Sequence, residues 1–229
     1  MVRKLADRVW HLDLNYVNAY LVDDDVLTLV DAGLPWSASN IGAEIRAAGF
    51  EPAQVERVLL THYDLDHVGA LAFLPGSQDL FVGAADLDLL AGRTKPSLSG
   101  VKQAIQRFGA VLLRPPNGPL SAVKDGDEIG SFTAVHTPGH SPGHMAYVSE
   151  ARDGAFTGDL LRSDGETLSR PPWYLNRDTA RIDASIERLL DRLPPVDIVA
   201  PGHGRPLVGD GRQAIRRLSD SEQPTQPRA

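Results

Sequence analysis

Four segments of this chain repeat one arrangement: an apolar run typical of a buried β-strand, then a turn, then histidine or aspartate. They are "VERVLLTHYDLDH" (55–67), "FTAVHTPGHSPGH" (132–144), "GAFTGD" (154–159) and "VDIVAPGHG" (196–204). A strand end is a rigid support, and a turn after it lets polar side chains face a shared cleft. A lone histidine is usually a core or surface residue, but four segments of the same design indicate one site. The fold must therefore bring several strand ends together.

The rest of the pattern favours two similar halves, each with strands followed by helices. We expect a helix from near Ser37 through "NIGAEIRAAGF" and another across 179–193. "LVDAG" (29–33) and "FTGDL" (156–160) are predicted to be equivalent acidic turns at strand ends. Two sheets packed face to face with helices outside would satisfy this pattern. We predict one domain over 1–218 and a polar tail over 219–229.

Composition excludes several classes of site and partner. The chain has no cysteine, so any metal site must use histidine and carboxylate ligands. The net charge of −7 argues against nucleic-acid binding. No apolar run is long enough to span a bilayer, and no secretory signal is visible. We therefore expect a cytoplasmic protein whose partner is a small-molecule substrate, with no nucleic acid and no membrane. A homodimer is left open.

Taken together, "THYDLDH", "TPGHSPGH", "FTGD" and "APGHG", in this order and spacing, resemble the metallo-β-lactamase superfamily of hydrolases, with a glyoxalase II-like or lactonase-like core. "NAYLVDDDVLTLVDAG" also resembles the N-terminal strands of that family. The resemblance covers nearly the whole chain. It implies an α/β (α+β) fold, the four-layer αββα sandwich, with the site at one edge between the two halves.

The resemblance also implies a dinuclear metal site. Metal site 1 would use His62, Asp64 and His140, metal site 2 would use Asp66, His67 and His203, and Asp159 would bridge two divalent ions (zinc, manganese or iron). A water or hydroxide between the ions would be the nucleophile. Asp66 would also be catalytic, orienting that water and passing a proton to the leaving group.

Other polar residues near these motifs receive different interpretations. Asp31 is either an outer residue that holds a ligand histidine or the turn, or a simple turn aspartate. His144 is not expected to be a ligand, and His136 and His11 are read as strand residues.

Position 64 departs from the family pattern, which usually has histidine there. Asp64 either binds the first ion, as glutamate does in flavodiiron-type relatives, or is too short and leaves site 1 weak or empty. If it binds, the site holds three carboxylates, Asp64, Asp66 and Asp159. The extra negative charge should make the ions poorer Lewis acids and favour manganese or iron over zinc.

Several branches of the family are argued against by what the chain lacks. The absent cysteine excludes β-lactamases with a cysteine ligand, and the short segment after His203 leaves little room for the helical region of a glyoxalase II. No flavodoxin-like domain and no basic nuclease arm is visible. The remaining expectation is a hydrolase of a small ester, thioester, lactone or phosphoester. The alternatives are a mono-iron oxygenase resembling persulfide dioxygenase, or a non-catalytic metal- or ligand-binding protein.

Two segments are expected to shape the substrate pocket. One is the glycine- and proline-rich stretch 92–120, in which "GRTKPSLSG" (92–100) and "LRPPNGPLS" (113–121) are predicted to be loops and the residues around 99–108 a helix. The other follows Asp159 and offers an apolar wall and two cations for an anionic group: Trp173, Tyr174, Arg162 and Arg170. The alternative is a surface loop whose aromatic residues pack on the core.

Overall fold

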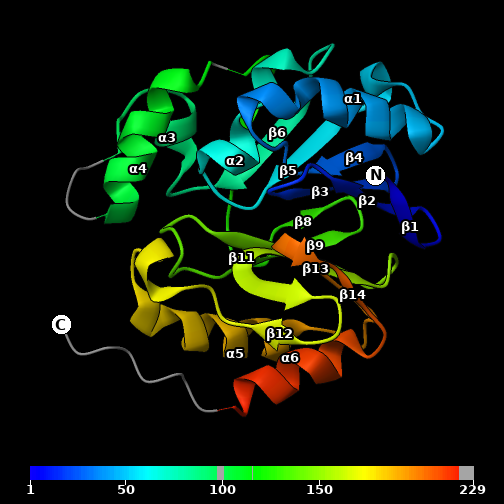
Figure 1. Cartoon of the computed structure of the whole chain (residues 1–229), viewed down its shortest axis with the longest axis vertical. Helices are drawn as coiled ribbons and strands as arrows, with labels where there is room; N and C mark the ends of the chain where they lie inside the picture. Colours follow the sequence, from blue (N-terminus) through cyan, green and yellow to red (C-terminus); the bar gives the residue numbers. More distant parts are fainter. Residues whose placement is uncertain (97–100, 115, 222–229) are drawn as a thin grey trace.

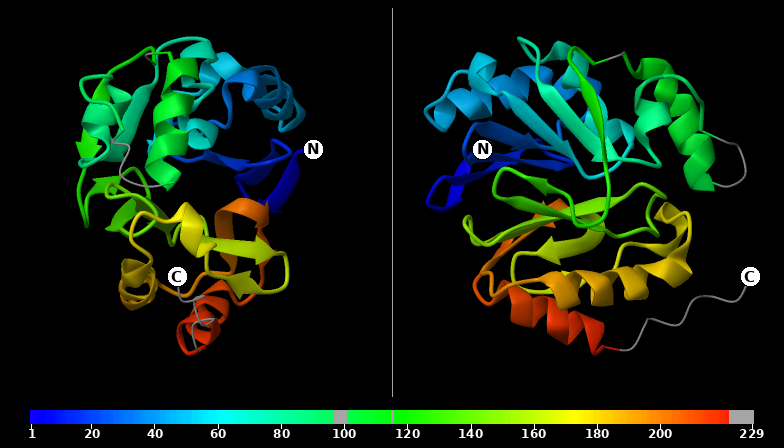
Figure 2. Two further views of the ribbon diagram at one scale, coloured as in Figure 1. Left: turned by 60° about the vertical axis from the view of Figure 1, so that its left-hand side comes forward. Right: turned by 180° about the vertical axis from the view of Figure 1, so that it is seen from behind.

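The computed structural model describes residues 1–96, 101–114 and 116–221, and the statements below refer to those residues. Two β-sheets pack face to face, and helices cover the outer face of each sheet (Figure 1). The two further views agree on this layering (Figure 2). The predicted four-layer αββα sandwich is confirmed.

The first sheet is built from the N-terminal half of the chain, and its seven strands lie in sequence order. The pairs from β1 to β4 are antiparallel, and those from β4 to β7 are parallel. The strands are β1 (Arg3–Ala6), β2 (Val9–Asp13), β3 (Asn18–Asp23), β4 (Leu27–Val30), β5 (Arg57–Leu60), β6 (Asp79–Gly83) and β7 (Leu120–Val123).

The second sheet has the order β14-β13-β11-β10-β9-β8, with β12 paired to β11. Only the pair of β11 and β13 is parallel. The strands are β8 (Glu128–Ile129), β9 (Phe132–His136), β10 (Met145–Ser149), β11 (Gly154–Asp164), β12 (Leu168–Ser169), β13 (Ile198–Arg205) and β14 (Leu207–Val208). Parallel pairing places Asp159 of β11 close to His203 of β13.

The α-helices follow the same division into halves. Those over the first sheet are α1 (Ala38–Ala47), α2 (Leu65–Val68), α3 (Leu87–Leu90) and α4 (Val101–Gly109), and those over the second are α5 (Ile182–Arg192) and α6 (Gly211–Ser219). The 3₁₀ turns are η1 (Pro35–Ser37), η2 (Pro52–Gln54), η3 (Leu71–Phe73), η4 (Ala110–Leu112), η5 (Trp173–Leu175) and η6 (Thr179–Arg181). Among the described residues, no helix combines the length and the apolar character that a bilayer span needs.

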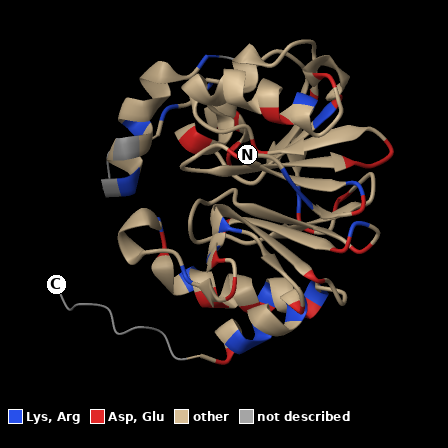
Figure 3. Cartoon of the chain, turned by 45° about the vertical axis from the view of Figure 1, so that its right-hand side comes forward, with Lys and Arg blue, Asp and Glu red and all other residues tan. Residues whose placement is uncertain are grey.

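Buried apolar side chains form three separate cores, because successive side chains of a strand point to opposite faces of its sheet. On β3, Leu21 packs into the core beneath the first helical layer, while its neighbour Tyr20 packs into the core between the sheets. Residues of a strand point to opposite faces in turn, so one apolar run serves both layers. The third core lies between the second sheet and helices α5 and α6. Acidic and basic residues are interspersed along this lower helical layer (Figure 3), and Arg216 and Arg217 of α6 are solvent-exposed.

The structure corrects the predicted positions of Asp159 and His203 relative to their strands. Asp159 and His203 were predicted to follow their strands, but both lie inside them, on β11 and β13. Between the register pairs Gly158–Pro201 and Arg162–His203, β11 advances further than β13, so Asp159 lies in a bulge. Gly158, with a φ of 48°, starts the bulge.

Residues 97–100 of the stretch 92–120, and 222–229 of the predicted tail, lie outside the described residues.

Replacing Gly158 with alanine tests the bulge. A Cβ there would lie 2.6 Å from both the Cβ and the Oγ1 of Thr61, and the positive φ disfavours any side chain. We expect Gly158→Ala to lower the free energy of unfolding by about 3 kcal/mol. Gly49→Ala is the matched control, since Gly49 has a φ of 97° but nothing within 4 Å of the added Cβ. Equal losses in urea unfolding of the two variants would contradict the close packing against Thr61.

Candidate metal centre

The loop after β5 supplies four of the seven predicted ligands. Thr61 directly follows β5, and Asp64 is the N-cap of the one-turn helix α2. His62 and Asp64 group with His140 from the loop between β9 and β10. Asp66 and His67 group with His203 from β13. In each group the potential ligand atoms lie within 4.8 Å of one another, so the structure brings both predicted triads together.

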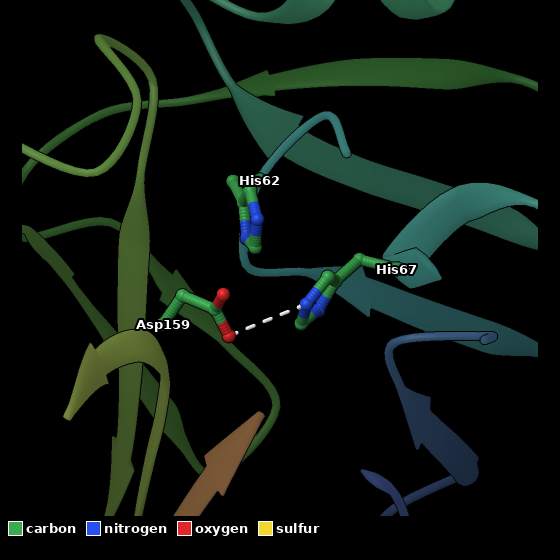
Figure 4. A group of neighbouring side chains, drawn as sticks. All are labelled: His62, His67 and Asp159. Carbon is green, nitrogen blue, oxygen red and sulfur yellow. Dashed lines mark ion pairs between the residues drawn. The ribbon is translucent and has the colours of Figure 1, made fainter. Parts of the chain in front are cut away.

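Asp159 lies between these two triads. Its Oδ1 is 3.3 Å from His67 Nε2, and its Oδ2 is 3.3 Å from both His140 Nε2 and His203 Nε2. Figure 4 shows the Asp159 side chain from β11 converging with His62 and His67. One carboxylate therefore contacts histidines of both groups, the arrangement that a bridging ligand requires.

Buried atoms without hydrogen-bond partners mark the centre of this cluster. Within the described part of the chain, His62 Nε2, His67 Nε2 and Asp159 Oδ1 are buried and have no partner. Buried polar atoms in proteins are nearly always bonded. Potential ligand atoms of these three residues lie within 4.8 Å of one another, so the unbonded atoms suit the binding of a metal ion. Imidazole nitrogen and carboxylate oxygen are the donors that zinc, iron and manganese accept. The residues present therefore fit a metal centre.

The four cluster histidines share one orientation. Each points Nε2 into the cluster and places Nδ1 against an acceptor outside it. The acceptors are Thr61 Oγ1 for His62 (3.0 Å), Asp31 Oδ2 for His67 (2.8 Å), Asn176 Oδ1 for His140 (3.2 Å) and the backbone carbonyl of Tyr16 for His203 (2.6 Å). Donation from Nδ1 leaves the Nε2 lone pair free to bind a metal.

Of the two interpretations of Asp31, the contacts of the structure support the one in which it holds a histidine and the turn. Its Oδ2 accepts hydrogen bonds from His67 Nδ1 and from Thr61 Oγ1, and its Oδ1 accepts the Thr61 backbone N–H at 2.9 Å. It thus holds both a ligand histidine and the start of the turn, at a φ of 58° that aspartate tolerates better than most residues.

The remaining histidines lie where the sequence predicted. His144 uses both ring nitrogens, since Nδ1 contacts Thr137 Oγ1 at 2.8 Å and Nε2 accepts the Asp159 backbone N–H at 3.1 Å. It positions Asp159, and neither of its ring nitrogens is free for a metal. His136 ends β9, and His11 lies on β2.

Sequence reasoning missed Asp86, which joins two of the ligand loops. Its carboxylate accepts hydrogen bonds from the Tyr63 N–H, the Ser141 hydroxyl and the Gly143 N–H, at 3.1, 2.9 and 3.1 Å. It lies just after β6, so it is a further polar residue after an apolar strand, a signal that "LFVGAAD" carried. Burial raises the pKa of this carboxyl group.

Two residues of α4 were also missed, and both contact Asp64. The Lys102 ammonium lies 3.0 Å from Asp64 Oδ2, although the lysine is only 5% exposed. Gln106, one turn later, donates a hydrogen bond to Asp64 Oδ1. Lys102 thus offsets the negative charge that Asp64 adds to the site, which the prediction from the sequence did not take into account. Nothing in the sequence around "SGVKQAIQ" indicates that α4 folds over the site.

Charged neighbours give the two triads opposite surroundings. Burial and the charge of Lys102 lower the pKa of His140 to about 4. Burial alone would lower the pKa of His203 as well, but Asp159 and Asp66 outweigh it and raise that pKa to about 10. Burial would raise the pKa of Asp64, but Lys102 and His62 hold it well below its usual range.

The predicted substrate residues separate into different environments. Trp173 and Tyr174 on η5 are 54% and 51% exposed, and their rings pack edge to face at 5.8 Å. Arg162 is half-buried on β11, beside His203 in the sheet register. Arg170 is paired with Asp183 at 2.6 Å and bonded to Ser221, which ties it to the layer of α5 and α6. Substrate binding by any of the four stays a prediction.

The stretch 92–120 lines a pocket of about 270 Å³ beside the ligand loop. Tyr63 and Val68 come from that loop, while Arg107 and Leu113 come from α4 and the segment after η4. The helix predicted around 99–108 is confirmed as α4, and the 3₁₀ turn η4 follows it directly.

Two facing sheets with helices outside, and histidine and aspartate loops meeting at one edge between them, define a metallo-hydrolase-like protein. Residues 12–203 match the family model of the metallo-beta-lactamase superfamily, and the chain belongs to that superfamily. It is 30% identical to the uncharacterized protein YobT of Bacillus subtilis, over 91% of this chain and 95% of YobT. It is 27% identical to the probable metallo-hydrolase YflN of the same organism, over 89% of this chain and 86% of YflN.

A solved structure supports the same assignment. TTHA1623, in a di-iron-bound form, superimposes with a TM-score of 0.67 at 30% identity, covering 88% of this chain and 93% of TTHA1623. A protein related along most of its length has therefore been seen with two iron ions.

Replacing Asp31 with asparagine tests the outer hydrogen bonds. Asparagine keeps the shape and tolerates the backbone, but exchanges one acceptor oxygen for an NH₂ group, so Thr61 and His67 cannot both keep their bonds. We expect about 10- to 100-fold weaker metal binding, measured by titration of chelator-treated protein. Asp79→Asn, at an exposed position on β6, is the control with the same charge change. Unaltered affinity in Asp31→Asn would show that the orientation of His67 does not depend on this bond.

Proposed function

We propose that this chain is a dinuclear metal-dependent hydrolase acting on a small ester, thioester, lactone or phosphoester. The observation that carries the proposal is the shared orientation of His62, His67, His140 and His203, whose Nε2 atoms meet three carboxylates at one edge of the sandwich. In the described part of the chain, His62 Nε2, His67 Nε2 and Asp159 Oδ1 are buried without hydrogen-bond partners, and potential ligand atoms of these residues lie within 4.8 Å of one another, which supports a bound ion at this place.

One triad, His62, Asp64 and His140, would hold the first ion, and the other, Asp66, His67 and His203, would hold the second. Asp159 would bridge them. Such ions act as Lewis acids that polarise the bond to be broken and lower the pKa of water.

Asp66 is the residue we assign to proton movement. Its side chain is 32% exposed, against 15% for Asp64 and 9% for Asp159, so it is the carboxylate most open to the cleft. His203 Nε2 lies 3.3 Å from its Oδ2 and keeps that oxygen oriented. An oriented and accessible carboxylate can take a proton from water and deliver it to a leaving group.

The ligand set supports iron or manganese at least as well as zinc. Three carboxylates and four imidazoles form a harder donor set than one richer in histidine. The di-iron form of TTHA1623, 30% identical to this chain, supports the same preference.

The segment after Asp159 supports a substrate with an apolar portion. Asn176, close after Trp173 and Tyr174, contacts His140, so η5 lies directly beside the first triad. Helix α4 lies against η5 as well. Two exposed aromatic rings at this position offer an apolar wall to whatever approaches the ions.

An assay of reconstituted protein tests the function. Protein loaded with iron, manganese or zinc should hydrolyse a member of a panel of esters, thioesters, lactones and phosphoesters, without oxygen uptake. Asp159→Ala should reduce the occupancy of both metals and lower kcat/KM by more than about a hundredfold, because both triads lose a shared ligand. His203→Ala should mainly lower the metal occupancy of the site formed with Asp66 and His67.

Three results would count against this reading. Oxygen consumption with a single bound iron would favour an oxygenase. Metal binding without turnover on the whole panel would favour a binding protein. Normal metal content and activity in Asp159→Ala would remove the bridging role.

Truncating Trp173 tests the apolar wall. We expect Trp173→Ala to raise KM about tenfold for substrates with an apolar group, the effect of losing roughly 1.4 kcal/mol of aromatic contact, and to leave metal content unchanged. Val208→Ala, at a 49% exposed position on the edge strand β14, is a control for loss of exposed apolar surface. If Trp173→Ala and Val208→Ala have the same KM on every substrate, Trp173 and Tyr174 do not contact the substrate and belong to a surface loop.

A further inference from the structure

Lys102 is a buried cation inside the candidate metal centre, and the proposed roles above do not use it. It lies in the first turn of α4, is 5% exposed, and its Nζ is buried without a hydrogen bond of good geometry in the described structure. Its ion-pair partner is Asp64 Oδ2, at 3.0 Å. Gln106 holds the other oxygen of Asp64, so α4 engages both oxygens of one carboxylate.

The same Asp64 oxygen is the one that faces the first triad. Asp64 Oδ2 lies 3.2 Å from His62 Nε2 and 3.1 Å from His140 Nε2. An ion held by these three atoms must share that oxygen with the ammonium. Because a metal–carboxylate bond is about 2 Å long, the two positive charges cannot be more than about 5 Å apart.

The second triad has no such cation. Among the described residues, the ion-pair partners of Asp66 are His67 and His203 alone, with no lysine or arginine. The two triads therefore differ in one respect that matters for a divalent ion. Within the described part of the chain, Arg162, the register neighbour of His203, is only half-buried and forms no ion pair with the second triad, whereas a buried ammonium forms an ion pair with the carboxylate of the first triad. At such a site little solvent screens the repulsion between charges.

We propose that Lys102 makes the two metal sites unequal, weakening the site of His62, Asp64 and His140 so that ions fill the site of Asp66, His67 and His203 first. The pair of Asp64 and Lys102 carries no net charge, as the neutral imidazole of a histidine would. It differs from histidine because half of the pair repels the ion. The inference rests on the proposed two-ion site.

The test is calorimetric titration of chelator-treated protein with Zn²⁺, which measures binding and not turnover. The wild type should show two binding events of different affinity. Lys102→Met should strengthen the weaker event about tenfold or more and leave the tighter event unchanged. Lys124→Met removes the same charge from an exposed position just after β7 and should change neither event. In a His203→Ala background, which disables the second site, the gain from Lys102→Met should persist.

A weaker event that Lys102→Met leaves unchanged or weakens would overturn the inference. A wild type that binds no Zn²⁺ would instead overturn the proposed function, so the two failures are distinct. Thermal melting in chelator gives a readout that needs no metal. Asp64→His should lower the melting temperature because it leaves Lys102 buried without a counter-ion, and adding Lys102→Met should restore it. Additive effects of the two substitutions would show that the residues do not act as a pair.

Discussion

Packing between the two sheets is the constraint on which the candidate site depends. His62, Asp64, Asp66 and His67 come from the first half of the chain, whereas His140, Asp159 and His203 come from the second. The apolar core between the sheets sets the distance between these groups. Hydroxyl groups fix it further, since Tyr147 of β10 donates to the Leu60 carbonyl of β5, and Tyr20 of β3 donates to the Pro201 carbonyl of β13. Both bonds join the two halves within a few residues of a candidate metal ligand. A change in the packing between the sheets would therefore also change the distances between the candidate ligands.

Much of this could be predicted from the sequence because the pattern is local. An apolar strand followed by a turn and a histidine is visible in one short segment, and the order of four such segments identified the family. The predicted place of Asp31 followed from the same logic. Asp159 was placed at a strand end because "FTGD" looks like a terminus, but sheet register is not local. Pairing with β13 carries β11 on to Asp164, and only the bulge at Gly158 accommodates the carboxylate.

Lys102 lay beyond prediction for a different physical reason. Its role arises because α4 folds back over Asp64, and that placement depends on packing between segments far apart in sequence. A charge count taken from motifs alone therefore omits the positive charge beside the first triad. Asp86 is an intermediate case, since its position after β6 was readable but its three partners lie on two other loops.

The four outer acceptors differ in how easily mutation can remove them. Thr61, Asp31 and Asn176 hold their histidines through side chains, so one nucleotide change can abolish each bond. His203 is held by the main-chain carbonyl of Tyr16, which every amino acid possesses. The hairpin between β2 and β3 can thus vary freely in sequence at that position, provided that its backbone path is kept. Tyr16 is 78% exposed. Over evolutionary time, its side chain can therefore be replaced, which changes the chemical character of the surface beside His203, without disturbing the hydrogen bond that holds His203.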